Sequence, residues 1–206
     1  MNLTTLEAAA LSKSFGGPPL FSGLSLRVES GLTAVAGRNG SGKTTLVKIL
    51  AGLLRAGSGT VEVRRGGVAL AGDARRLALG WAGPDLSLYE DFTGLENLSF
   101  FRRAAGFAAD RADLERRLAE VGLESAAGLR VGAYSTGMRQ RLRIAFSILF
   151  EPPILLLDEP MAGLDLEGRA TVARLVAQRR REGAVVLASN DPRDFEEPEQ
   201  LIELGT

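Results

Sequence analysis

The sequence contains no cysteine and no histidine among its 206 residues. Without cysteine, neither a disulfide framework nor a thiolate metal site can form. Without histidine, the chain lacks the side chain that proteins most often use as a general base and metal ligand near neutral pH. Any catalysis must therefore depend on carboxylates, hydroxyls and cationic side chains.

Net charge is also absent, because 25 basic residues balance 25 acidic ones. A chain without a net field has no general attraction for nucleic acid, so we expect no nucleic-acid partner. The first ten residues lack a basic segment, and the longest apolar runs, such as 144–150, are far shorter than the roughly 20 residues that cross a bilayer. We expect a cytoplasmic protein that is peripheral to the cytoplasmic face of the inner or plasma membrane.

One glycine-rich run stands out after the apolar stretch 32–36: Gly37-Arg38-Asn39-Gly40-Ser41-Gly42-Lys43-Thr44-Thr45. Its glycines allow the backbone N–H groups to wrap around phosphates without steric hindrance from a Cβ atom. Lys43 would reach the terminal phosphates and Thr44 would ligate Mg²⁺, while the positive end of the following helix faces the anion. The run predicts a nucleoside triphosphate site between a strand and a helix.

Two carboxylates, Asp158 and Glu159, follow the apolar strand pattern 154–157. The carboxyl edge of a parallel sheet would place them beside the phosphate loop. Asp158 suits Mg²⁺, directly or through water, and Glu159 would orient or deprotonate the water that attacks the γ-phosphate. The alternative is a pair of solvated acids at a strand end, and the phosphate-binding run counts against it.

The order of hydrophobic patterns predicts a single α/β domain over residues 1–206. Strands are expected at 24–28, 32–36, 59–63, 79–82, 154–157, 185–188 and near Leu201, with helices at 43–54 and about 166–181. Apolar spacings of three and four residues between 95 and 150 indicate a helical insertion. Residues 66–76 read as a surface turn region. Continuous apolar strands imply a parallel sheet that is covered on both faces.

A second polar run, Tyr134-Ser135-Thr136-Gly137-Met138-Arg139-Gln140, opens a strongly amphipathic helical pattern. Ser135 suits a helix N-cap, and the N–H groups after it form a second anion-binding terminus. By itself the string indicates a plain N-cap, but one nucleotide rarely needs two phosphate sites in one chain. Together with the other motifs it resembles the signature motif of the ATP-binding-cassette (ABC) ATPases, usually Leu-Ser-Gly-Gly-Gln. Ser135 and Gly137 match that motif, and Thr136 replaces its first glycine.

The resemblance covers essentially the whole chain, with the motifs in the family's order. It makes 37–45 the Walker A loop and 154–159 the Walker B strand, and it makes 161–165 the D-loop, which ends at Asp165. Phe15 falls where the family places an aromatic that stacks on adenine, although a packed turn residue is the simpler interpretation. The resemblance therefore implies that all these positions belong to a nucleotide site.

The resemblance also implies a fold and a set of partners. The fold is α/β: a P-loop NTPase core with a mostly parallel sheet, N-terminal antiparallel β strands and an inserted helical subdomain. The core would span about 1–83 and 151–206, and the helical subdomain about 84–150. The implied cofactors are ATP and Mg²⁺. Two ATPase domains, as a homodimer or heterodimer, would enclose each ATP between one Walker A loop and the other chain's Ser135 terminus, and would drive a membrane permease on a separate chain.

Three further positions depart from the family pattern. Pro84 stands where a glutamine is usual, and Asp85 would replace it only if the loop shifts by one position; otherwise Asp85 is a solvated loop acid. Asn190 stands at the place of the switch histidine and can donate a hydrogen bond but cannot carry charge. Arg38 replaces a small residue or proline, and either faces solvent or reaches the ribose or the partner. We expect a slow but real ATPase, because Glu159 remains.

The leading interpretation is the ATPase subunit of a membrane transporter. The run 21–25 and the segment 88–98 look like the haem-exporter branch linked to cytochrome c maturation, but exporters of drugs or polysaccharides use similar subunits. The first alternative is a soluble ABC-type ATPase without a permease, in a regulatory or assembly role. An unrelated P-loop kinase or GTPase is the second, and it would not require Ser135 at a helix start. The cargo of a transporter touches the permease, so this sequence does not specify it.

Overall fold

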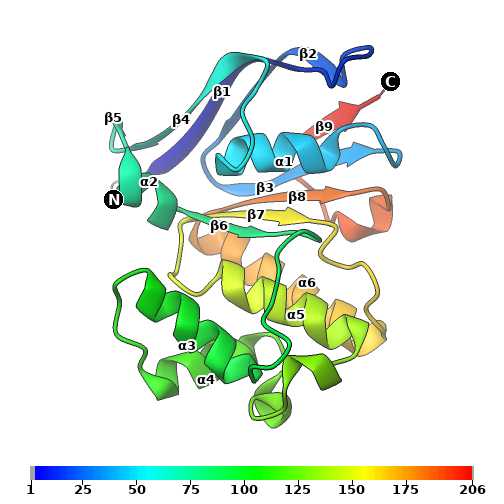
Figure 1. Cartoon of the computed structure of the whole chain (residues 1–206). Helices are drawn as coiled ribbons and strands as arrows, with labels where there is room; N and C mark the ends of the chain where they lie inside the picture. The colour runs from blue at the N-terminus through cyan, green and yellow to red at the C-terminus, as the bar shows by residue number, and fades with distance from the viewer. Residues whose placement is uncertain (1–2, 206) are drawn as a thin grey trace.

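A computed structural model of the chain describes residues 3–205, which form two sheets with helices around them (Figure 1). The larger sheet has the strand order β6-β7-β8-β3-β9, and all its pairings are parallel. Its strands are β3 (Gly31–Gly37), β6 (Leu79–Ala82), β7 (Ile154–Asp158), β8 (Ala184–Ser189) and β9 (Gln200–Leu204). β7 and β8 are buried along their whole length, which explains why their sequences are continuously apolar.

The smaller sheet is antiparallel and has the strand order β2-β1-β4-β5. Its strands are β1 (Thr4–Lys13), β2 (Phe21–Val28), β4 (Ser58–Arg65) and β5 (Val68–Ala69). β1 is not among the strand ranges expected from the sequence, because its three consecutive alanines, 8–10, have weak strand propensity. Pairing with β2 on one side and β4 on the other outweighs that local weakness.

Helices cover the sheets on both sides. They are α1 (Lys43–Ala51), α2 (Gly72–Leu77), α3 (Gly94–Ala104), α4 (Arg111–Glu120), α5 (Thr136–Ser147) and α6 (Leu166–Glu182), with 3-10 turns η1 (Glu124–Ala126), η2 (Val131–Ala133) and η3 (Pro192–Asp194). α1 ends before the predicted residue 54, because Gly52 adopts a left-handed φ of 79° and caps the helix. No helix within residues 3–205 is long and apolar enough to span a membrane.

The prediction of a plain turn region over 66–76 was wrong. This segment contains β5, which pairs with the end of β4, and most of α2. Asp73 lies in the first turn of α2 and Arg75 and Arg76 in its last turn, an arrangement that favours a short helix through its dipole. The glycine content of the segment hid this helix from the sequence pattern.

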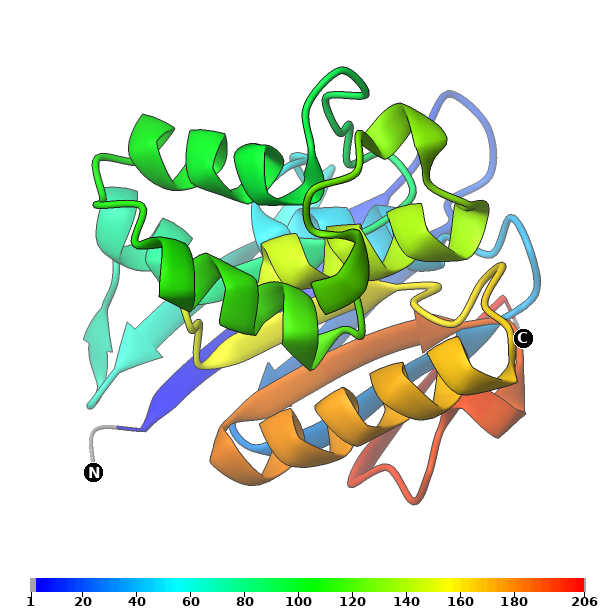
Figure 2. The same cartoon turned by 90° about the horizontal axis from the view of Figure 1, so that it is seen from below.

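Two hydrophobic cores lie on opposite faces of the parallel sheet, and alternate residues of β7 point into each. Ile154 and Leu156 pack with α1 and the antiparallel sheet, whereas Leu155 and Leu157 pack with the other helices. Figure 1 shows α1 between the two sheets, and Figure 2 shows α3, α4, α5 and α6 on the opposite side of the parallel sheet. The predicted phosphate-binding run and the helix start at Ser135 therefore belong to different layers of the molecule.

Candidate functional site

The predicted phosphate loop, Gly37–Thr45, joins the end of β3 to the first turn of α1. Gly40 and Gly42 have left-handed φ angles of 83° and 101°, which glycine adopts without strain. At Gly37 the constraint is space, because a Cβ would lie 2.6 Å from the Leu204 carbonyl oxygen. The loop therefore has the backbone shape that a phosphate cradle requires, with Thr44 and Thr45 in the first helical turn and Ser41 just before it.

Lys43 lies folded into this loop, with a side chain that is 5% exposed. Its Nζ donates to the carbonyl oxygens of Gly37 at 2.8 Å and Arg38 at 3.3 Å. It also lies 3.5 Å from Oε1 of Glu159. The ammonium group thus stands between the loop and the strand-end acid, where a terminal phosphate would meet both.

Asp158, at the end of β7, is 1% exposed, and neither of its carboxylate oxygens has a hydrogen-bond partner within residues 3–205. Burial raises the pKa of Asp158, and the neighbouring Glu159 charge adds to the effect, whereas the Thr44 hydroxyl, Lys43 and Lys48 lower it. An unpartnered buried carboxylate beside a threonine hydroxyl fits Mg²⁺, which prefers such oxygen ligands. The described residues contain no cluster of three or more acids that could hold a metal, so phosphate oxygens and water would complete the shell.

Glu159 is held in a strained backbone conformation, with a φ of 48°. Its N–H donates to the Ala188 carbonyl oxygen at 2.8 Å, and its own carbonyl oxygen accepts from Gln140 Nε2 at 3.1 Å. The side chain is 28% exposed, and its Oε1 accepts from the Asn190 backbone N–H at 3.1 Å. The structure therefore fixes this carboxylate between β7, β8 and the phosphate loop.

Asn190 also joins this group, because its Nδ2 donates to Asn39 Oδ1 in the phosphate loop at 3.0 Å. The amide of Asn190 thus already faces the loop that would hold the phosphates. Sequence analysis missed two further neighbours: Ser189, whose hydroxyl lies 3.2 Å from Glu159 Oε2, and Asp194 beside that hydroxyl. The available signal was the position of Ser189, a polar residue directly after the apolar run of β8.

The second predicted anion site opens α5. Ser135 is the N-cap, and its Oγ accepts from the Met138 N–H at 3.2 Å. A Cβ on Gly137 would lie 3.2 Å from the Gly163 carbonyl oxygen, so Thr136, Gly137 and the predicted D-loop are packed together. Asp165 caps α6, with Oδ1 accepting from the Gly168 N–H at 2.8 Å. Since α5 and α1 pack on opposite faces of the parallel sheet, this terminus is separated from the chain's own phosphate loop.

The remaining predicted positions lie at the rim. Phe15, in the loop between β1 and β2, is 67% exposed, and Lys13 Nζ lies 4.9 Å from its ring centroid. Arg38 is exposed, as is Pro84 after β6. Asp85 forms an ion pair with Lys48 of α1, so this carboxylate is engaged rather than simply solvated.

Comparisons with known proteins agree with this geometry. The family described as ABC transporter matches residues 21–162. The cytochrome c biogenesis ATP-binding export protein CcmA of Nitrobacter winogradskyi is 37% identical over 175 residues, which cover 84% of this chain and 85% of that protein. The chain belongs to the ABC transporter family. The ATP-binding proteins of this family are ATPases, which excludes the unrelated kinase or GTPase.

One further relative and one solved structure are also similar to this ABC protein. The daunorubicin resistance ATP-binding protein DrrA3 of Streptomyces coeruleorubidus is 37% identical over 203 residues, which cover 97% of this chain and 64% of that protein. The chain thus spans about three fifths of the length of the two daunorubicin resistance relatives it matches. A putative ABC transporter ATP-binding protein from Pyrococcus furiosus has the same fold, with a TM-score of 0.80, 20% identity and 97% of each chain covered. The predicted fold class is therefore confirmed.

Proposed function

We propose that this ABC protein hydrolyses ATP, and that Lys43 and Glu159 are its main catalytic side chains. The observation that supports this most strongly is their meeting at the phosphate loop, 3.5 Å apart, with the strained Glu159 backbone held from two sides. Lys43 would exchange its loop carbonyl contacts for the terminal phosphates. Glu159 would then orient the attacking water or accept its proton.

Mg²⁺ belongs to the same proposal. Thr44 and Asp158 would hold the ion, which supplies charge neutralisation at the β- and γ-phosphates when it is bound. Asn190 would turn its amide from Asn39 to the γ-phosphate and donate one hydrogen bond. Because an amide cannot carry positive charge, we expect slower turnover than a histidine at this place would give.

A second ABC domain would complete each site. The partner's Ser135, Thr136 and Gly137 would present the N-terminus of α5 to the γ-phosphate, since within one chain α5 and α1 pack on opposite faces of the parallel sheet. Asp165 would lie at the contact between the two domains, and Phe15 would stack on adenine. Arg38, exposed beside the loop, would reach the partner or the ribose. Either a second copy or a related ABC chain would meet these requirements.

We propose that a membrane permease on a separate chain binds the surface around β6 and α3. A groove of about 400 Å³ lies between α2, β6 and the ends of α1 and α5, with Leu53, Trp81 and Phe150 among its lining residues. Nearby on α3 and the segment before it, Tyr89 and Phe100 are 46% and 42% exposed and meet edge to face, with ring centroids 5.0 Å apart. Exposed aromatic clusters of this kind typically mark protein interfaces. Bound to such a permease, the ATPase chain would lie on the cytoplasmic face of the membrane as a peripheral protein.

The names of two relatives point to different transported substrates. CcmA is named for cytochrome c biogenesis export, and DrrA3 for daunorubicin resistance. The similarity to CcmA supports export, and the equal identity to DrrA3 favours neither cargo over the other. A soluble ABC-type ATPase without a permease is the alternative, and the exposed groove and aromatic cluster count against it.

Two experiments test these proposals. Turnover of MgATP by purified protein should exceed that of a Glu159→Gln variant, with and without the membrane partner; equal rates would refute the assignment of ATPase activity. A pull-down from detergent extract should recover an integral membrane protein, and this recovery should fall when Phe100 and Trp81 are replaced by alanine. Recovery of soluble scaffolds or ribosomes alone would refute the transporter role.

A further inference from the structure

The hydroxyl of Ser189 stands between two carboxylates. Ser189 ends β8 and is 1% exposed. Its Oγ lies 2.6 Å from Asp194 Oδ2 and 3.2 Å from Glu159 Oε2, and it accepts from the Asp191 N–H at 3.1 Å. Since a hydroxyl has one proton, Ser189 cannot donate fully to both carboxylates at once.

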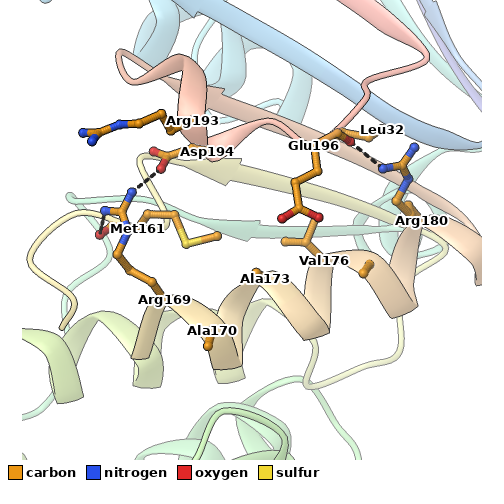
Figure 3. A pocket seen from close by; sticks show the side chains of 11 residues that line it. Leu32, Met161, Arg169, Ala170, Ala173, Val176, Arg180, Arg193, Asp194 and Glu196 are labelled. Atoms are coloured by element: carbon orange, nitrogen blue, oxygen red, sulfur yellow. Dashed lines mark hydrogen bonds and ion pairs between the residues drawn. The ribbon is translucent and has the colours of Figure 1, made fainter. Parts of the chain in front are cut away.

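Asp194, the second carboxylate beside this hydroxyl, is paired with an arginine of α6. Arg169 reaches from α6 to Asp194, with Nη2 2.5 Å from Oδ1, and its Nη1 donates to the Met161 carbonyl oxygen at 3.4 Å. Figure 3 shows this pair at one end of a cavity of about 220 Å³ between α6 and the segment that contains η3. The shorter distance shows that the Ser189 hydroxyl donates mainly to Asp194 and more weakly to Glu159. A carboxylate that is paired with an arginine attracts the serine proton less strongly than an unpaired one, so the Arg169 pair favours sharing of that proton with Glu159.

The two oxygens of the Glu159 carboxylate have different surroundings. Oε1 faces the Asn190 N–H at 3.1 Å and Lys43 Nζ at 3.5 Å, both of which face the proposed phosphate site. Oε2 faces Ser189, which is the hydrogen-bond donor found for it within residues 3–205. When Lys43 turns to a phosphate, Ser189 and the Asn190 backbone remain to hold the carboxylate.

We propose that Ser189 is a positioning residue for Glu159, and that the Asp194–Arg169 pair sets how its single proton is shared. The hydroxyl holds Oε2, so that Oε1 stays directed at the attacking water. Arg169 lies in the first turns of α6, directly after the predicted D-loop, so the pair connects that helix with the hydrolytic carboxylate. This inference rests on the proposed ATPase activity.

The first test compares ATPase kinetics of the full chain with those of Ser189→Ala and Ser189→Thr. Loss of one hydrogen bond to a charged group should lower kcat about tenfold in Ser189→Ala, with KM for MgATP unchanged. Threonine keeps the hydroxyl and should restore the rate. Ser147→Ala is the matched control, because its buried hydroxyl donates to the Ile144 carbonyl oxygen within α5. This control should keep the wild-type rate.

The second test uses Asp194→Asn, which separates proton sharing from a merely structural role. With its carbonyl oxygen toward Arg169, the new amide would present an N–H₂ donor to Ser189, and the serine proton would turn to Glu159. We expect kcat at or above the wild-type value in this variant, and no effect of the same change in a Ser189→Ala background. A thermal melt of each variant checks that it is folded.

The results of these assays separate failure of the positioning role of Ser189 from failure of the proposed ATPase activity. Absence of turnover in the wild type would refute both the proposed ATPase and this positioning role. Turnover in the wild type together with an unchanged rate in Ser189→Ala would refute the positioning role alone. A fall in kcat for Asp194→Asn that equals the fall for Ser189→Ala, with the two effects additive, would also refute it. If Ser189→Ala does not fold, Asp194→Asn alone decides the question: a kcat at or above the wild-type value supports the positioning role, and a kcat clearly below it refutes the role.

Discussion

Replacing Asp158 with asparagine should stabilise the protein in the absence of metal. Both oxygens of this 1% exposed carboxylate lack partners within residues 3–205, and an unsatisfied buried polar group costs about 1–3 kcal/mol. Asparagine has the same shape but no charge, and its amide keeps part of the penalty. A net gain of about 1 kcal/mol would raise Tm by roughly 2–4 °C in a domain of this size.

The stabilisation by Asp158→Asn should decrease as the pH is lowered. Burial raises the pKa of Asp158 above its value in the unfolded chain. The penalty is therefore present in full above the raised pKa of the folded state, and it disappears as pH falls below the unfolded value. The difference in Tm between the variant and the wild type should be largest near neutral pH and should shrink in acid.

Thermal melts with EDTA and with saturating MgATP provide the assay. Saturation at about 100 times Kd stabilises a protein by about 2.7 kcal/mol, so the wild type should gain several degrees with MgATP. Asp158→Asn should lose most of the Mg²⁺-dependent part of that gain. Asp110→Asn is a suitable control, because asparagine caps α4 as well as aspartate does. A lower Tm for Asp158→Asn in EDTA, together with a full MgATP shift, would refute the reasoning.

Other changes should have equally defined results. Lys43→Ala should abolish the nucleotide-induced Tm shift, and an unchanged shift would contradict the loop assignment. Asn190→His should raise kcat about tenfold by adding charge at the γ-phosphate; an equal rate would show that the position is unimportant. Ser135→Ala should lower Tm by a few degrees through loss of a cap worth about 1 kcal/mol, and should weaken ATP-dependent dimerisation, as measured by light scattering. Asp191 should remain ionised in an NMR titration until pH approaches its pKa of about 2, because Arg193 hydrogen-bonds its carboxylate. The contribution of this pair to stability should be full above the ordinary pKa of 3.8 and should be lost progressively as pH falls from 3.8 through about 2.

The sequence predicted the elements whose patterns are local. The apolar runs of β7 and β8 and the amphipathic spacing of α5 and α6 are fixed by burial, and the structure has them within a few residues. β1 could not be recognised in the same way, because its stability comes from two strand neighbours rather than from its alanine-rich sequence. α2 was hidden for a related reason, since no residue of this short helix is buried.

In the candidate site, too, local sequence patterns were predictable and long-range contacts were not. The predicted phosphate loop and the acid pair Asp158 and Glu159 each lie in a contiguous run of sequence, so their spacing alone predicted them as candidate site residues. The contact of Asn190 with Asn39 spans 151 residues, and the contact of Glu159 with Ser189 spans 30, so both depend on the order of β3, β8 and β7 in the sheet. The ion pair of Asp85 with Lys48 was likewise not predictable from either segment alone.

Light scattering of the Glu159→Gln variant at saturating MgATP tests the central claim most directly. If two ABC domains enclose ATP between the Gly37–Thr45 loop and the Ser135 terminus, blocked hydrolysis should trap the pair, and the measured mass should double relative to the nucleotide-free sample. A mass that stays monomeric with MgATP, even when candidate partner domains are supplied, would contradict the claim.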